Sequence, residues 1–237
     1  MLIFGKNTVK EAITKKRNIK TIYLSNEKVL NELPKNEVVK SAKIVIMPLK
    51  EMDKMVKGNH QGAIVEISDE YHYQLLNKVI EKNKDKENVS LIMLDGLEDP
   101  HNLGAILRTA DATGMEGIII PKNRSVSLNA TVAKVSTGAI EYVDVVQVTN
   151  LVQTIKELKE NGYWIIGLEM EGSIDYKEQD YLGKKVIIIG SEGRGISRLV
   201  KEECDFMINI PMIGHVTSLN ASVSASIIFY EILRQRG

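Results

Sequence analysis

From Val89 onward, short apolar runs alternate with helical patterns, and this alternation constrains the fold more than any other feature. The runs are rich in β-branched side chains and lie at Ser90–Leu94, Gly117–Ile120, Val143–Val148, Trp164–Leu168, Val186–Ile189 and Phe206–Ile210. Helical patterns separate most of them, at Leu103–Thr113, Ala130–Thr137, Leu151–Asn161, Ile196–Glu203 and Asn220–Arg236. Near-continuous apolar strands between helices predict an α/β fold with a mostly parallel sheet and helices on both faces.

The N-terminal part predicts a smaller α/β unit. Strands are expected at Thr21–Leu24, Lys43–Met47 and Ala63–Ile67, and helices at Thr8–Lys16, Glu27–Lys40 (interrupted by Pro34), Leu49–Lys57 and Tyr71–Ile80. The charged run that follows, Glu81–Asn88, is typical of a solvated linker. We therefore predict a domain over 1–67, a linker over 68–88 and a second domain over 89–237.

Charge is distributed unevenly between these parts. The whole chain of 237 residues balances 31 Lys and Arg against 31 Asp and Glu. Residues 1–67, however, hold 13 basic and 7 acidic side chains, a net charge of +6. Such asymmetry indicates that the N-terminal part binds a polyanion, although a lysine-rich solubilising surface is an alternative.

Several classes of protein are disfavoured by the composition. Cys204 is the single cysteine, which excludes an intramolecular disulfide and is typical of a reducing cytoplasm. The sequence has no secretory signal pattern and no apolar run near the roughly 18 residues that a membrane span requires. The histidines lack a spacing that favours shared metal ligation; they are His60, His72, His101 and His215. We therefore expect a cytoplasmic protein with neither a membrane span nor a metal.

Three loops at the ends of predicted strands hold the candidate functional residues. In the first, Asp99-Pro100 ends a strand, Asn102 is the expected N-cap of the next helix, and Arg108 falls on its second turn. The simpler interpretation of this loop is a helix cap followed by a surface arginine.

The second loop is the glycine-rich stretch from Gly190 to Gly195, with Glu192 near its middle. Its glycine spacing differs from the dinucleotide-binding fingerprint, and no Gly-Lys-Ser/Thr sequence of a phosphate loop follows. Glycines there permit close approach of the backbone to a ligand. A glycine-rich turn with a solvated glutamate is the alternative.

The third loop, Ile210–Ser226, leads from a strand into a helix whose first turns are built from small residues. Ser218 and Asn220 supply capping groups, and the small side chains permit close packing or close approach of a ligand. The carboxyl ends of parallel strands meet at one edge, so the three loops predict one shared crevice.

Taken in order, these loops resemble the three signature motifs of the SpoU (TrmH-type) family of RNA ribose methyltransferases, part of the SPOUT superfamily. The stretches that carry the resemblance are Asn102–Ala110, Ile189–Gly195, and Ile210–Met212 together with Ser218–Val223. The likeness covers residues 89–237. It implies S-adenosylmethionine as methyl donor, a C-terminal trefoil knot, and a homodimer with active sites at the interface.

The resemblance also implies roles for individual residues. It carries five residues over as catalytic, namely Asn102, Arg108, Glu192, Ser218 and Asn220. Our choices for the cofactor pocket are Gly190, Gly193, Ile210, Met212, Leu219 and Ala221. A guanidinium rarely loses its proton, so our hypothesis is that Arg108 clamps the adjacent phosphate while a phosphate oxygen or Glu192 takes the hydroxyl proton. Thr137–Ala139 and Glu141 are further candidates for bordering the RNA or cofactor site.

The N-terminal part is similar to one branch of that family. Phe4–Ile13 and His60–Ile64 carry this likeness, with Asn7 standing where the branch often has histidine. The branch methylates a guanosine ribose of large-subunit 23S rRNA and uses a ribosomal-protein-like RNA-binding domain. The alternatives are a tRNA 2′-O-methyltransferase, a non-catalytic RNA-binding protein that retains the fold, and a nucleotide-dependent oxidoreductase. The oxidoreductase lacks its glycine fingerprint here.

Overall fold

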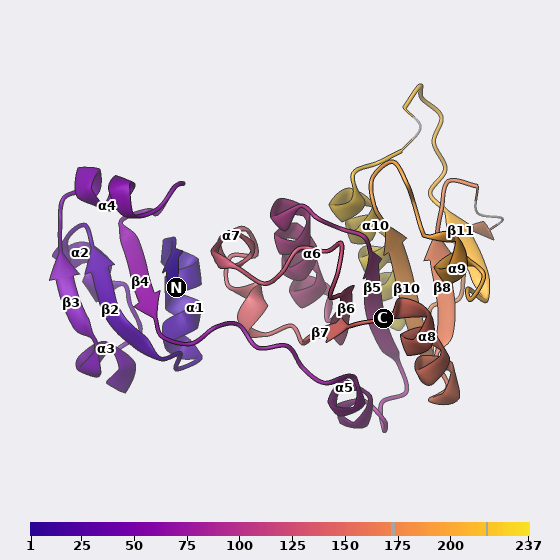
Figure 1. Cartoon of the computed structure of the whole chain (residues 1–237), viewed down its shortest axis with the longest axis horizontal. Coiled ribbons are helices and arrows are strands. Elements are labelled where there is room, and N and C mark those ends of the chain that lie inside the picture. The colour runs from indigo at the N-terminus through magenta and orange to yellow at the C-terminus, as the bar shows by residue number, and fades with distance from the viewer. Residues whose placement is uncertain (172–173, 217) are drawn as a thin grey trace. The chain divides into compact units, whose positions relative to one another are not determined.

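The computed structural model describes residues 1–171, 174–216 and 218–237, and it divides into two compact units (Figure 1). The first unit combines Met1–His72 with Leu128–Tyr142, and the second combines Tyr73–Ser127 with Val143–Gly237. A segment that lies between two strands of the second unit in the sequence therefore folds with the first.

The first unit is built on a four-stranded sheet in the order β1-β4-β2-β3. Its strands are β1 (Leu2–Phe4), β2 (Ile19–Leu24), β3 (Lys43–Ile46) and β4 (Ala63–Ile67). Its helices are α1 (Lys6–Thr14), α2 (Glu27–Asn31), α3 (Glu37–Ser41), α4 (Leu49–Met55) and α7 (Ala130–Val135), followed by a 3-10 helix at Ala139–Glu141. Strand β4 runs antiparallel to β1 and β2, whereas β2 and β3 are parallel. The helix expected over Glu27–Lys40 is two short helices on either side of Pro34, and β1 was not predicted.

Specific contacts hold the Leu128–Tyr142 segment to the N-terminal part. Thr8 Oγ1 donates to the Ala133 carbonyl at 3.4 Å. Gly138 has a φ of +100°, and a Cβ at this position would lie 2.4 Å from Glu11 Cγ. This close approach, together with the left-handed backbone, requires a glycine.

A buried charge cluster also belongs to this unit. Arg17 Nε lies 2.7 Å from Asp69 Oδ2, and Arg17 Nη1 lies 3.4 Å from Glu141 Oε2. The guanidinium also stacks 4.4 Å from the ring centroid of Tyr71. Burial raises the pKa values of Glu141 and Tyr71, and in Glu141 the raising outweighs the opposing effect of Arg17. The cluster ties the 3-10 helix at Ala139–Glu141 to residues near the end of β4.

The second unit contains a seven-stranded sheet in the order β7-β6-β5-β10-β8-β11-β9, in which every adjacent pair is parallel. Its strands are β5 (Val89–Asp95), β6 (Gly117–Pro121), β7 (Val145–Val148), β8 (Trp164–Leu168), β9 (Ile174–Asp175), β10 (Lys184–Gly190) and β11 (Phe206–Asn209). Its helices are α5 (Leu76–Lys82), α6 (Pro100–Thr113), α8 (Leu151–Glu160), α9 (Arg198–Lys201) and α10 (Ala221–Arg236). The predicted α/β class with a largely parallel sheet is confirmed.

Helices cover both faces of this sheet. Successive residues of a strand point to opposite faces, so each strand packs its side chains against helices on both sides. Leu91 and Met93 of β5 pack in one core cluster with α5, α8 and α9. Helix α10 packs against α6 and β10 and buries Ile228, Phe229 and Ile232. Apolar residues on both faces explain why the strands appear in the sequence as unbroken apolar runs.

Two local details of this unit differ from the sequence expectations. The helix expected over Tyr71–Ile80 begins only at Leu76, because Gln74 forms a parallel bridge to Val146 beside β7. The two-residue strand β9 was not predicted, since it is too short to show a periodic pattern. The trefoil knot stays a prediction.

Candidate functional site

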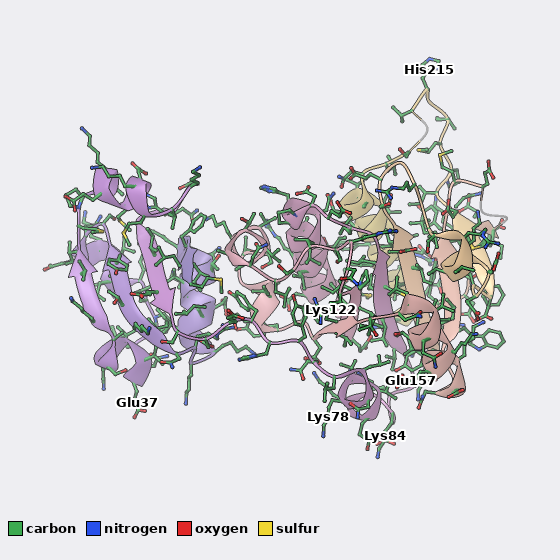
Figure 2. All side chains as sticks on the ribbon, in the orientation of Figure 1. Glu37, Lys78, Lys84, Lys122, Glu157 and His215 are labelled. Carbon is green, nitrogen blue, oxygen red and sulfur yellow. The ribbon has the colours of Figure 1, made fainter. Side chains whose placement is uncertain are left out.

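The three loops singled out in the sequence leave the same edge of the second sheet. The neighbouring strands β5, β10, β8 and β11 are parallel, so their carboxyl ends, among them Asp95, Gly190 and Leu168, lie on one side (Figure 1). The described chain that follows β11 extends away from this edge as far as exposed His215 (Figure 2). Thr217 of the third loop lies outside the described residues. Side chains from all three loops can therefore meet at one place.

Asn102, Glu192 and Asn220, one from each loop, form a closed hydrogen-bonded triangle. Asn102 Nδ2 donates to Glu192 Oε1 at 3.1 Å, and Asn220 Nδ2 donates to Asn102 Oδ1 at 2.9 Å. Asn220 Nδ2 is also within hydrogen-bond distance of Glu192 Oε1, as is the backbone N–H of Ala221 at 3.3 Å. One carboxylate oxygen therefore accepts from three donors, while Glu192 Oε2 has no hydrogen bond from any described residue.

Helix α6 begins earlier than the sequence predicted, and this changes the role of Asn102. Asp99 is the N-cap, because its side chain accepts from the backbone N–H of His101, and Pro100 occupies the first turn. Asn102 is therefore inside the helix, only 7% exposed, and both Nδ2 and Oδ1 of its amide take part in the triangle. The expectation that Asn102 caps the helix was wrong.

The start of α10 follows the prediction for one residue but not for the other. Asn220 is the N-cap, with Oδ1 accepting from the backbone N–H groups of Ser222 and Val223. Its Nδ2 is thereby aimed at Asn102 and Glu192. Ser218 makes no capping hydrogen bond and is exposed, so the capping role expected for it was wrong.

The glycine-rich loop is a tight turn whose geometry requires its glycines. Ser191 and Gly195 form an antiparallel bridge, with N–H···O distances of 2.9 and 3.2 Å. A Cβ on Gly190 would lie 2.1 Å from the carbonyl carbon of Gly195, so no larger residue fits there. Gly193 and Gly195 have φ values of +82° and +64°. The turn brings the Glu192 carboxylate to the other two loops.

A cavity of about 450 Å³ opens beside this turn. It is lined by all six residues chosen from the sequence for a cofactor pocket, which are Gly190, Gly193, Ile210, Met212, Leu219 and Ala221. Glu192 and Ser218 line it as well. Its wall combines backbone from the glycine-rich turn with apolar side chains from the ends of β10 and β11, as small-molecule sites do.

Arg108 is not brought to this place. It lies six residues beyond Asn102 on α6, on the third turn instead of the predicted second, and it does not line the cavity. The side chain is exposed and makes no hydrogen bond or ion pair with a described residue. Its neighbour Thr109 contacts Ser226 of α10, with the two hydroxyl oxygens 3.1 Å apart. Arg108 therefore points from the α6–α10 pair to solvent.

Sequence reasoning missed a glutamate that shapes the cavity. Glu169 follows β8, lines the cavity with Met170 and Glu171, and accepts from the backbone N–H of Ile196 at 2.6 Å. It thereby fixes the far end of the glycine-rich turn. Its position directly after a predicted parallel strand was the signal that could have identified it. Thr137–Ala139 and Glu141 belong to the first unit, as described above.

Two features are absent from the described ranges. No group of three or more His, Cys, Asp and Glu side chains there has a geometry that could hold a metal ion. None of the helices in those ranges is long and apolar enough to cross a bilayer.

Comparison with known proteins gives matches over both parts of the chain. Residues 89–230 match the family described as the SpoU rRNA methylase family, and residues 2–73 match the family described as RNA 2′-O ribose methyltransferase substrate binding. A protein of Staphylococcus saprophyticus named as a TrmH family tRNA/rRNA methyltransferase is 50% identical, over 100% of this chain and 96% of its own. These matches confirm the resemblance drawn from the sequence motifs.

Solved structures share the fold at lower identity. The SpoU methyltransferase AviRb of Streptomyces viridochromogenes, in complex with AdoMet, has a TM-score of 0.77 at 24% identity, covering 100% of this chain and 90% of its own. An AdoMet-bound rRNA methyltransferase of Sinorhizobium meliloti has a TM-score of 0.78 at 24% identity, covering 98% and 86%.

Proposed function

Because the chain belongs to the SpoU rRNA methylase family, we propose that it transfers a methyl group from S-adenosylmethionine to a ribose 2′-hydroxyl of RNA. One observation carries the proposal: the Asn102–Glu192–Asn220 triangle stands beside a cavity lined by residues of two of the three loops. That the chain is an RNA methyltransferase of this family rests on the family match itself.

The cavity fits the proposed donor in size and chemistry. Its volume of about 450 Å³ lies within the range of small-molecule sites, roughly 300–1,000 Å³. Glu169, Glu171 and Glu192 line it and suit a ligand that carries a sulfonium and an ammonium group. Gly190 has no space for a Cβ, so backbone groups form the wall where an adenine would be recognised. The donor supplies an activated methyl group and needs no metal.

The residues of the chain are then left to orient and deprotonate the hydroxyl. Glu192 Oε1 is occupied by its three donors, which fix the carboxylate plane. Glu192 Oε2 is the atom open to accept the ribose proton, in agreement with one arm of our sequence hypothesis. In this proposal Asn102 and Asn220 act as positioning residues and Ser218 shapes the cavity mouth.

The N-terminal unit is proposed to bind the RNA. It includes the residues 2–73 that match the substrate-binding family, and residues 1–67 carry a net charge of +6. Its likeness to one branch of the family favours a guanosine of 23S rRNA, with tRNA as the alternative. A protein that acts on either RNA is expected to work in the cytoplasm.

We further propose that the protein is a homodimer through α10. Three large apolar residues of this helix are exposed, and their spacing places them on one face. They are Val223 (47% exposed), Tyr230 (56%) and Leu233 (37%). A second copy packed on that face would cover these side chains and bring its own Arg108 near the cavity. This arrangement accounts for an arginine that no described residue of its own chain engages.

Complementation between subunits tests the role of Arg108. Arg108→Ala and Glu192→Ala are each expected to abolish methyl transfer. If Arg108 acts on the site of the other subunit, mixed dimers regain one intact site, so activity returns on mixing. Failure of mixed dimers, once exchange of subunits is verified by mass spectrometry, would contradict the shared site.

Transfer of tritiated methyl tests the reaction itself. Separate 23S rRNA, 16S rRNA and tRNA fractions are incubated with the protein, and the labelled nucleotide is identified after digestion. Label on the ribose of a 23S rRNA guanosine is expected. Label on a base would refute the reaction type, label on tRNA would refute the substrate, and no label with S-adenosylmethionine bound would favour a non-catalytic RNA-binding protein.

A further inference from the structure

A second cavity, of about 380 Å³, lies on the other side of the glycine-rich turn. Ser191, Arg194 and Gly195 line both cavities, so one turn forms a common wall. Residues at or beyond the carboxyl ends of β5 and β6, among them Asp95 and Arg124, complete the second cavity. Apart from the shared turn, the function proposed above gives this cavity no role.

Three arginines from three different segments line this second cavity. Arg124 follows β6, Arg194 lies in the glycine-rich turn, and Arg198 begins α9. All three are exposed, and Arg124 and Arg194 form no ion pair with a described residue. Arg198 pairs with Glu202 at 3.0 Å, but side-chain exposures of 81% and 56% make that pair weak and easily exchanged. Guanidinium groups in this state are available to an anionic ligand.

The backbone at Arg124 is strained. Its φ is +54°, a left-handed conformation that is uncommon for a residue other than glycine. The two carboxylates of the cavity do not cancel its three arginines, which leaves a formal net charge of +1. Asp95 Oδ2 is also engaged by the backbone N–H of Ser197 at 2.7 Å. Glu98 is the other acidic lining residue. The balance favours a ligand that carries phosphate together with hydrogen-bond donors, which a nucleotide does.

We propose that this cavity binds a phosphodiester-bearing nucleotide of the RNA strand next to the methylated one, with Arg124 and Arg198 gripping the phosphate. The inference rests on the proposed function, since it places the strand across the turn from the methyl donor. Arg194, in the wall of both cavities, links the two. The cavity thus sets where the strand enters the site.

Salt-dependent RNA binding by the full-length protein tests this inference. The variants are Arg124→Gly, which removes the guanidinium and also relieves the left-handed backbone, and Arg124→Gly combined with Arg198→Ala. Lys122→Ala is the matched control, because Lys122 is an exposed cation of the same loop that does not line the cavity (Figure 2). Anisotropy of a fluorescent, mixed-sequence single-stranded RNA is measured over a series of potassium chloride concentrations, with S-adenosylmethionine present.

The double variant is expected to bind the RNA roughly tenfold more weakly or worse and to lose about 0.7 from the log–log salt slope for each phosphate contact removed. Its affinity for S-adenosylmethionine and its circular dichroism spectrum stay those of the wild type. If the log–log salt slope of the double variant equals that of the Lys122→Ala control, the inference is overturned.

Methyl transfer by the wild-type protein separates this inference from the proposed function. If the wild type methylates RNA while the double variant keeps the wild-type salt slope and the wild-type KM for RNA, the inference about the second cavity is wrong and the proposed reaction stands. If the wild type does not methylate RNA while the double variant shows the expected loss of salt slope, the proposed reaction is wrong and the RNA-binding site is supported.

Discussion

At the scale of single residues, Asn220 performs two tasks with the two ends of one amide. Its Oδ1 caps α10 by accepting from backbone N–H groups, while its Nδ2 reaches Asn102 and Glu192. Serine retains the first ability and lacks the second. Aspartate retains the cap but places a second carboxylate against Glu192. The two tasks can therefore be separated by substitution.

Asn220→Ser and Asn220→Ala are expected to reduce methyl transfer alike, by at least roughly tenfold, since both remove the Nδ2 donor. Only Asn220→Ala also loses the cap, so it should be less stable than Asn220→Ser by about 1 kcal/mol. Urea unfolding and single-turnover kinetics measure the two effects. Wild-type turnover in Asn220→Ser would show that the triangle does not position Glu192.

The thiol of Cys204 provides a residue-scale test of burial. Desolvation is the main cause that raises its pKa from 9.0 to about 11. At pH 8 the thiolate fraction is then about a hundredfold below that of an ordinary cysteine, and the thiolate is the reactive form. Ellman's reagent is expected to react about a hundredfold more slowly with the native protein than with protein unfolded in urea. Equal rates would contradict the burial.

At the scale of elements, the glycine-rich turn between β10 and α9 leaves no room for side chains at its base. Gly190→Ala would place a methyl group against the Gly195 backbone, so the turn must open. We expect S-adenosylmethionine affinity to fall at least roughly tenfold, measured by calorimetry. Gly214→Ala is the matched control, because a Cβ there meets nothing within 4 Å. Equal affinities in the two variants would remove this turn from the cofactor site.

Much of the fold and part of the site followed from the sequence, for physical reasons that differ between elements. The parallel strands were predictable because burial on both faces leaves an unbroken apolar run, as in β5 and β10. The start of α6 was not, because Asp99-Pro100 resembles a strand terminator as much as a helix start. Glu169 directly follows a predicted parallel strand, but its contact with the distant backbone N–H of Ile196 cannot be read from that position alone.

At the scale of the whole molecule, the first unit depends on a charge cluster that spans distant parts of the sequence. The pKa of Glu141 is raised by burial, so the folded state holds a proton on this carboxyl more tightly than the unfolded state does. Above about pH 4.5 the unfolded chain loses that proton first, and the contribution of Glu141 to stability decreases as the pH rises through its folded pKa.

Glu141→Gln cannot titrate and therefore lacks this decrease. The melting temperature of the variant minus that of the wild type should therefore increase as the pH is raised from 5 toward 8, as followed by circular dichroism. Arg17 retains its contact with Asp69 in this variant. A difference in melting temperature that is independent of pH would place the titration elsewhere.

The attachment of Leu128–Tyr142 to the first unit also has a consequence for synthesis on the ribosome. The N-terminal unit begins first but cannot be completed until residue 142 has left the exit tunnel, 70 residues after His72. At about 5–20 residues per second, that interval lasts about 4–14 seconds. During this time β1 to β4 lack α7 and Glu141, the second carboxylate partner of Arg17, while β5, α6 and β6 are being synthesised. The order in which the units are encoded is thus not the order in which they are finished.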